Sequence, residues 1–452
     1  MTLEFSDLIR ADAKRLETRM AKEFIISGDS HVVEPVDLYK TRLPRNMRDQ
    51  ALWEEDTILD EPLVPGGHTE FRTVHTPGYE GWTVSRYRQF PGPTPDGRPE
   101  SILRDLDRDG VDATMLFPNL SFFALYTDIH DRSIAHARVY NDWLAETYLP
   151  YSNRLRPAAA IPTTDVADGV KEIERAVRLG LTALILPEIP QPLPYWAPEY
   201  EPLWAAAEAN GLPVFFHVAS GGVDSKAGTS ATGSQVKGIL TAMTMGKQEL
   251  DGALLAGRTM GGGSTAAASP MRIIADLVSS GACERHPNLM FNVIEFNAGW
   301  LANYMGSMDK AWRTGTGQDP HWWLGFWDDG VDPHDQKLMG RMFKINERWP
   351  LPLKPSEYVK RNIRVQFADD KVAVMSRHIT GADTIYWGSD YPHAEGTFLG
   401  SQAVIEEQFA DVPDEDRAKI LGSNLAKIVG FDDSKKLAPV NPPAPPKVPA
   451  PA

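Results

Sequence analysis

A repeated alternation between short apolar runs and amphipathic segments constrains the fold of this chain more than any other feature. From about residue 103 onward, runs rich in β-branched and aromatic residues alternate with segments of helical periodicity. This alternation is typical of a parallel sheet. Together with one at 24–26, the expected strands lie at 113–118, 157–161, 181–186, 212–217, 289–295, 363–367 and 384–388. Eight such repeats predict an α/β fold, a closed (β/α)8 TIM barrel, in which chemistry collects at the C-terminal ends of the strands.

Three long segments interrupt the alternation, and we expect all of them to follow strands and to lie over the C-terminal face of the barrel as lids or binding loops. The first is rich in Pro, Gly and Arg, the second in Gly, Ser and Ala, and the third contains the stretch HWWLGFW; they span about 41–100, 219–270 and 304–358. The aromatic stretch would bury apolar surface over the site or in an oligomer interface. We expect an N-terminal helical extension over 1–22, the barrel over 23–437 and a Pro/Ala-rich tail over 438–452.

Composition limits the classes of partner. The chain has 46 basic and 61 acidic residues, a net charge of −15, and no long basic block. These numbers argue against binding to nucleic acid or to an anionic membrane surface and favour a small-molecule substrate. The single cysteine, Cys283, excludes an internal disulfide and a cysteine-based metal cluster and fits a reducing cytoplasm. Any metal must therefore be held by histidines and carboxylates.

Residues that can bind metal gather where four of the expected strands end. The first strand is followed by Asp29, His31 and Glu34, the fifth ends in His217, the sixth ends in Glu295, and the eighth runs into Asp390 and His393. A barrel would bring these four strand ends to one centre. Read alone, the first cluster also fits a surface turn that Asp29 caps, and a lone histidine at a strand end is often a core residue. Buried carboxylates clustered without a metal, however, would destabilise the fold.

Several motifs carry a resemblance to a known family. They are GDSHVVEP, LFPN, YNDWL, FFHVAS, YWGSDYPH and ILGSNLAKIVG. With them the chain resembles the amidohydrolase-related metal enzymes, in the branch that includes aminocarboxymuconate-semialdehyde decarboxylase and the aromatic-acid decarboxylases. The resemblance implies that Asp29, His31, His217 and Asp390 are metal ligands. Two positions depart from the family pattern, because Asp29 replaces a histidine and Glu295 stands where the family has a histidine used for catalysis or metal binding.

These departures enrich the expected site in oxygen ligands. Asp29, Glu34, Glu295 and Asp390 would bring more negative charge than one divalent ion can balance. Two ions with a bridging carboxylate would relieve that excess, and oxygen-rich ligand sets favour Fe or Mn over Zn. Some family members that the chain resembles at these positions are dinuclear iron monooxygenases. The leading hypothesis is therefore an O2-dependent monooxygenase with two Fe, or Fe and Mn, that hydroxylates a small organic acid or a carrier-linked acid.

Two alternatives stay open. In the first, a metal such as Zn activates water or polarises a carboxylate in a hydrolase or a non-oxidative decarboxylase, with Glu295 or His393 as the catalytic acid or base. In the second, the chain is a non-catalytic partner of an active paralogue; a homo-oligomer such as a dimer is also expected. The remaining candidates are substrate-binding residues in the insertions, namely Arg86, Arg88, Trp322 and Trp323.

Overall fold

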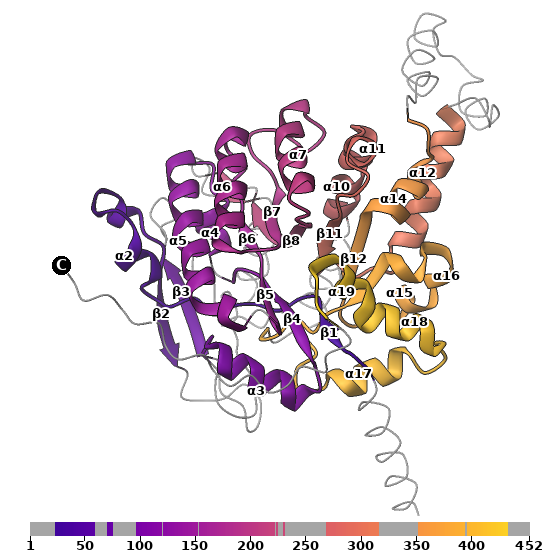
Figure 1. Cartoon of the computed structure of the whole chain (residues 1–452), viewed down its shortest axis with the longest axis horizontal. Coiled ribbons are helices and arrows are strands. Elements are labelled where there is room, and N and C mark those ends of the chain that lie inside the picture. Colours follow the sequence, from indigo (N-terminus) through magenta and orange to yellow (C-terminus); the bar gives the residue numbers. More distant parts are fainter. Residues whose placement is uncertain are drawn as a thin grey trace, which may run out of the picture.

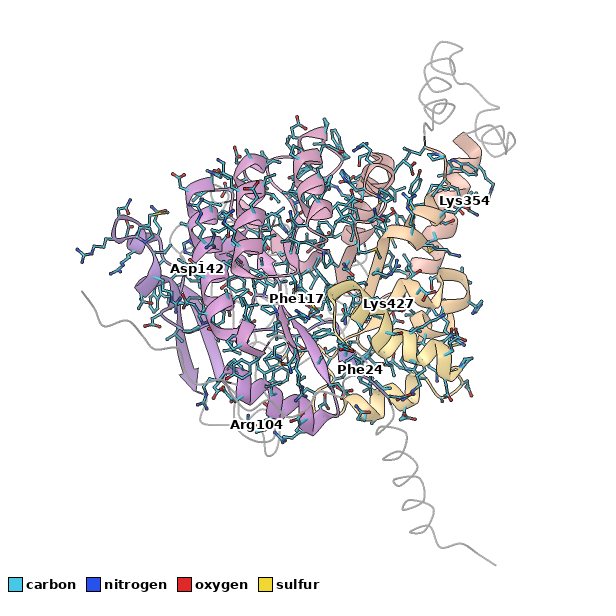
Figure 2. All side chains as sticks on the ribbon, viewed as in Figure 1. Phe24, Arg104, Phe117, Asp142, Lys354 and Lys427 are labelled. Atoms are coloured by element: carbon cyan, nitrogen blue, oxygen red, sulfur yellow. The ribbon has the colours of Figure 1, made fainter. Side chains whose placement is uncertain are left out.

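The computed structural model shows a ring of strands enclosed by helices that follow one another around the outside in chain order (Figure 1). It describes residues 23–58, 70–75, 96–119, 121–151, 153–221, 223–224, 229–230, 268–315, 351–393 and 396–432. Figure 2 shows that side chains fill the space between the ribbons. The predicted extension over 1–22 and the tail over 438–452 lie outside the described residues.

The ring consists of parallel strands in chain order. They are β1 (Ile26–Ser27), β4 (Ala113–Leu116), β5 (Leu155–Pro157), β6 (Ala159–Ala160), β7 (Leu184–Ile189), β8 (Val214–Gly221), β11 (Phe291–Ile294), β12 (Ile363–Phe367) and β13 (Ile385–Trp387). Only Ala158 separates β5, which pairs with β4, from β6, which pairs with β7, so the two share one position in the ring. The other neighbours also pair in parallel. The eight predicted strand positions are therefore confirmed.

Backbone hydrogen bonds between the end of β13 and the end of β1 close the ring. The Gly28 amide donates to the Trp387 carbonyl at 3.0 Å, and the Asp390 amide donates to the Asp29 carbonyl at 2.9 Å. A Cβ atom on Gly388 would lie 2.7 Å from the Asp29 amide nitrogen, so the close approach of the two segments requires glycine there. The predicted TIM barrel is thus present, and its seam lies at the metal-ligand candidates.

Apolar strand residues and helix-capping residues explain why the strands and helices form where they do. Every residue of β4 and β11 is buried, as expected for parallel strands covered on both faces. In the helix of residues Val166–Leu179, the Asp165 side chain accepts a hydrogen bond from the Asp168 amide at the N-terminus, and Gly180 ends the helix in the left-handed conformation at φ 93°. Its residues Ile173 and Ala176 face the core.

The helices cover the outside of the ring. They are α2 (Leu38–Arg42), α3 (Pro99–Asp109), α4 (Phe122–Leu125), α5 (His130–Tyr148), α6 (Val166–Leu179), α7 (Glu201–Ala209), α10 (Ala268–Ser279), α11 (Ala282–Arg285), α12 (Leu301–Gly315), α14 (Pro355–Asn362), α15 (Lys371–Met375), α16 (Arg377–Thr380), α17 (Ser401–Gln408), α18 (Asp414–Ala418) and α19 (Asn424–Val429). Among the described residues, no helix combines the length and apolar character needed to span a membrane.

The described parts of the insertions contain structure of their own. In the first, β2 (Trp53–Ile58) pairs antiparallel with β3 (Glu70–His75), and in the second, β9 (Val223–Asp224) pairs antiparallel with β10 (Thr229–Ser230). The expectation for the third was wrong at both ends, because α12 and α14 extend into the segment predicted as an insertion after a strand. The amphipathic pattern of α12 was hidden by its Gly, Ser and Asn residues, which are weak helix formers.

A buried carboxyl group on α3 makes the stability of the barrel pH-dependent. Burial raises the pKa of Asp109 to about 6, although the Ser401 amide and hydroxyl donate hydrogen bonds to it. Because its pKa is higher in the folded than in the unfolded chain, its stabilising contribution is present below about pH 4 and is lost as the pH rises through about 6.

We therefore predict that Asp109→Asn raises the free energy of unfolding at pH 8 by roughly 1–3 kcal/mol and leaves it nearly unchanged at pH 4. Asparagine stays neutral and can keep the contacts with Ser401. Denaturant unfolding at both pH values is the measurement, with Asp411→Asn, at an exposed position, as the control. A variant that is less stable than the wild type at pH 8 would contradict the argument.

Candidate metal centre

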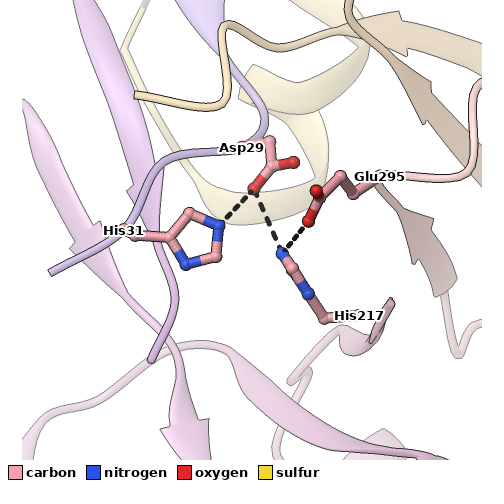
Figure 3. A group of neighbouring side chains, drawn as sticks. All are labelled: Asp29, His31, His217 and Glu295. Atoms are coloured by element: carbon pink, nitrogen blue, oxygen red, sulfur yellow. Dashed lines mark ion pairs between the residues drawn. The ribbon is translucent and has the colours of Figure 1, made fainter. Parts of the chain in front are cut away.

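The predicted ligand residues come together at the C-terminal ends of four strands. Asp29 and His31 follow β1, His217 lies in β8, and Glu295 follows β11. Figure 3 shows these four side chains directed toward one centre. Two groups of four side chains place one ligand atom each within 4.8 Å of the others: Asp29, His31, His217 and Glu295, and His31, Glu295, Asp390 and His393. The structure thus brings six of the seven strand-end candidates together.

Carboxylate oxygens and imidazole nitrogens face one another across this centre. The Nε2 atom of His31 lies 3.6 Å from Asp29 Oδ1 and 3.3 Å from Asp390 Oδ1. The Nε2 atom of His217 lies 3.5 Å from Asp29 Oδ1 and 3.2 Å from Glu295 Oε2. Within the described residues, neither oxygen of Asp29 and neither Nε2 atom has a hydrogen-bond partner, although all are buried. Such atoms are rare in folded proteins unless a ligand satisfies them.

The backbone fixes the tautomer of both histidines. The Nδ1 atom of His31 lies 2.7 Å from the Pro118 carbonyl, and that of His217 lies 2.8 Å from the Val218 carbonyl. Because a carbonyl only accepts hydrogen bonds, each Nδ1 carries the proton and each Nε2 carries a lone pair. In the neutral tautomers, lone pairs and carboxylates therefore face one another, an arrangement that a bound cation stabilises. The donor set fits a divalent metal ion.

The pKa shifts of the two histidines have opposite directions. Burial lowers the pKa of His31, and the neighbouring His393 and His217 lower it further, so its imidazole is neutral as a metal ligand requires. Burial also acts to lower the pKa of His217, but the Asp29 carboxylate outweighs this effect and raises it. Metal binding at His217 must therefore compete with a proton, and affinity should fall as the pH falls.

The cluster contains four buried side chains and two that are partly exposed. Asp29, His31, His217 and Asp390 are at most 3% exposed. The side chains of Glu295 and His393 are 24% and 16% exposed, so they border the open side. His393 Nδ1 lies 2.8 Å from Asp390 Oδ1 and its ring stacks on that of His31 with a centroid distance of 4.0 Å. The cluster therefore combines four buried side chains with two that reach its partly exposed side.

Two of the site carboxylates sit on strained backbone. Glu295 has φ 65° and Asp390 has φ 56°, values in the left-handed region that residues with a side chain rarely adopt. The amide of Glu295 donates to Gln366 Oε1 at 2.7 Å, and the Asp390 amide is held at the barrel seam. Strain of this kind persists where neighbouring contacts enforce it and is common at functional sites.

The structure gives Glu34 a different environment from the one predicted. Its Oε1 atom accepts hydrogen bonds from the amides of Asn119 at 2.8 Å and Ser121 at 3.2 Å, and Glu34 belongs to neither ligand group. The carboxylate thus holds the loop after β4, where the Asn119 side chain lies 3.3 Å from His393 Nε2. That Glu34 is a ligand remains a prediction, whereas its hydrogen bonds show that it orders this loop.

Sequence reasoning missed three residues that support the centre. Asn119 contacts His393, Gln366 holds Glu295, and the Phe122 ring packs 5.0 Å from that of His217. Asn119 stands in the motif LFPN, and Gln366 is a lone amide in an apolar strand, a signal that was available. The predicted substrate-binding residues Arg86, Arg88, Trp322 and Trp323 lie outside the described residues.

Comparison with known proteins identifies the family. A family model described as amidohydrolase matches residues 75–431. The chain belongs to the amidohydrolase family. This match confirms the family that the motifs indicated. It does not confirm the predicted monooxygenase branch. The amidohydrolase matches also agree with the barrel seen here.

Relatives with assigned activities cover part of this amidohydrolase. The γ-resorcylate decarboxylase of Polaromonas sp. (strain JS666) is 30% identical over 122 residues, 25% of this chain and 37% of that protein. The enzyme of the same name from Rhodococcus jostii (strain RHA1) is 33% identical over 97 residues, 19% of this chain and 30% of that protein. The matches therefore span about a third of the relatives' length.

Solved structures share the fold. An amidohydrolase from Mycobacterium avium subsp. paratuberculosis aligns with a TM-score of 0.61 and 16% identity, over 90% of this chain and 100% of that one. A 5-carboxyvanillate decarboxylase from Sphingomonas paucimobilis gives 0.55 and 19%, over 91% and 100%. A dihydroxybenzoic acid decarboxylase from Polaromonas sp. JS666, with bound manganese and the inhibitor 2-nitroresorcinol, gives 0.53 and 17%, over 92% and 99%. At these identities the similarity shows the fold.

A single variant distinguishes a Glu34 that binds metal from a Glu34 that only orders the loop after β4. Glu34→Gln keeps the oxygen that accepts from Asn119 and Ser121 but removes the charge. We predict that the variant binds as much Mn2+ per chain as the wild type, within about twofold in affinity, since losing an anionic ligand typically costs far more. Metal analysis after dialysis is the measurement, and Asp29→Asn, which should lose the metal, is the matched control. A comparable loss in Glu34→Gln would restore Glu34 to the ligand set.

Proposed function

We propose that the chain is a metal-dependent, non-oxidative decarboxylase of a small carboxylic acid, with hydroxylated aromatic acids as the first substrate class. The observation that carries the proposal is the pair of overlapping ligand groups, in which buried carboxylates and imidazoles lie beside the partly exposed Glu295 and His393. The names of the partially matching relatives, γ-resorcylate decarboxylases, support the same reaction class. This is the alternative that the sequence had left open, and it is better supported than monooxygenation.

A single divalent ion would suffice for this reaction. Asp29, His31, His217 and Asp390 would hold it, and the two carboxylates would neutralise it. When bound, the ion would act as a Lewis acid that orients and polarises the substrate's carboxylate. Manganese is the first metal to test, because one of the structurally similar decarboxylases contains it.

Glu295 and His393 would handle the proton. Decarboxylation breaks the bond between the carboxylate carbon and the adjacent carbon, releases CO2, and leaves an electron pair that must accept a proton on that adjacent carbon. Glu295 lies at the open rim, so it is placed to deliver this proton. His393 contacts Asp390 through Nδ1 and Asn119 through Nε2, so it is placed to orient the aspartate. Apolar Phe122 borders the histidines and would limit water.

We predict that the Mn2+-loaded protein releases CO2 from 2,6-dihydroxybenzoate or 5-carboxyvanillate and, in D2O, places one deuterium on the carbon that carried the carboxylate. Glu295→Gln should keep the metal and lower kcat by about 100-fold or more, because it loses only the transferable proton. Gas analysis, NMR of the product and metal content are the readouts. If the metal-loaded protein leaves a broad panel of aromatic acids intact, the proposal fails.

A dinuclear iron monooxygenase is the second candidate, and the carboxylate at position 295 is what favours it. Asp29, Glu295 and Asp390 together carry one negative charge more than a single divalent ion balances. Either a proton on Glu295 or a second ion removes that excess. The two ligand groups share His31 and Glu295, and His31 has only its Nε2 to offer, so a second ion would rely on Glu295, Asp390 and His393. Two irons would supply oxygen activation.

Metal stoichiometry distinguishes the two candidates. We predict about one Mn2+ or Fe2+ per chain in protein purified from medium supplemented with both metals, and the same number in Glu295→His, because the four buried ligands are unchanged. Elemental analysis per chain is the measurement. Two ions per chain, reduced to one by Glu295→His and accompanied by O2 consumption with an organic acid, would instead establish the monooxygenase. One tightly held Zn2+ with ester or amide cleavage would indicate the hydrolase.

A further inference from the structure

A cavity lies at the opposite end of the barrel from the metal centre. Its volume is about 430 Å3. Pro213, Met290 and Arg364 line it at or just before the starts of β8, β11 and β12, whereas His217 and Glu295 lie at the far ends of β8 and β11. The helix α19 covers it, with Asn424, Lys427 and Ile428 in the wall. In Figure 1 this helix lies beside β12, and Figure 2 labels Lys427 on it.

Arg364 brings a poorly compensated positive charge to this cavity. Its Nη1 donates to the carbonyls of Lys360 at 3.2 Å and Ile363 at 2.7 Å. Among the described residues, no carboxylate oxygen lies within 4.0 Å of its nitrogens. A guanidinium has five N–H donors, so most of them remain for other acceptors. Burial lowers the pKa of Arg364 and outweighs the opposing effects of Asp383 and Tyr386.

The acidic groups in the cavity wall are engaged elsewhere. Glu208 accepts from the Asn288 amide at 2.9 Å and lies 2.9 Å from His286 Nδ1. Asp383 lies 3.9 Å from Lys419 Nζ. Lys427, in contrast, forms no ion pair with any described residue. Among the described residues, Arg364 and Lys427 thus have no carboxylate within ion-pair distance, although Asp383 in the same wall acts on Arg364 from farther away.

We propose that this cavity binds a small organic anion, with its carboxylate on Arg364 and Lys427 and its apolar body against Leu212, Met290 and Ile428. Guanidinium groups bind carboxylates through two parallel hydrogen bonds, which gives the anion a defined orientation. The volume lies in the usual range of small-molecule sites, and the lining combines apolar side chains with a few polar groups as such sites do. The site is separate from the metal centre and does not depend on the reaction proposed there.

The probe is 4-iodobenzoate, which has one carboxylate, a flat apolar body and an anomalous scatterer. Calorimetric titration of the full metal-loaded chain should show a binding event that Arg364→Met weakens at least tenfold and Lys427→Met a few-fold. Arg178→Met, an exposed arginine on α6, is the matched control and should bind like the wild type. Asp390→Asn should also retain this event, which separates it from occupancy of the metal centre.

Crystals soaked with the probe give the decisive readout. An iodine peak beside Arg364 is the expected result. Iodine only at the metal centre would overturn the proposal, as would unchanged affinity in both Arg364→Met and Lys427→Met. Equal affinity for the neutral 4-iodobenzyl alcohol would also overturn it, because the argument rests on the anion. If Arg364→Met fails to fold, the exposed Lys427→Met variant and the soaked crystal decide the question.

Discussion

The hydrogen bonds that join the end of β13 to the end of β1 are the interaction on which the metal centre depends. Asp29 and Asp390 are far apart in the chain, and the Asp390 amide reaches the Asp29 carbonyl only because the barrel closes there. The same seam requires Gly388 and holds Asp390 at a positive φ, so that its carboxylate turns inward toward His31. Barrel closure and ligand geometry are therefore one structural feature, and a change that opens the seam should lose both stability and metal.

The position of Glu34 lowers the number of carboxylates whose charge a metal ion must balance. The argument for two metal ions began from four carboxylates, and the hydrogen bonds of Glu34 to two backbone amides compensate one of them. Three carboxylates exceed the charge of one divalent ion by a single unit, which one proton on Glu295 can remove. The choice between one metal and two thus reduces to the state of one partly exposed side chain. A proton held there is also what a decarboxylase needs to complete its reaction.

The fold was predictable because the strands are buried on both faces and read as continuous apolar runs, as in Phe291–Ile294. The clustering of the candidate ligands was predictable because chemistry in such barrels collects at strand ends, which are visible in sequence. The directions in which the side chains point were not predictable from the sequence. Glu34 follows β1 as closely as a ligand would, yet its partners lie 85 and 87 residues away. Gln366 and Glu295 likewise meet across 71 residues, a contact that no local pattern reveals.

The strand β12 runs from the cavity toward the end of the barrel that holds the metal centre. Its side chains at Arg364 and Gln366 are two residues apart and so share one face of the strand. Arg364 lines the cavity at the starts of the strands. Gln366 accepts the hydrogen bond that fixes the strained backbone of Glu295. The cavity and the backbone of Glu295 are therefore supported by the same strand. Glu295, the proposed proton donor, is held through Gln366 by the strand that carries Arg364.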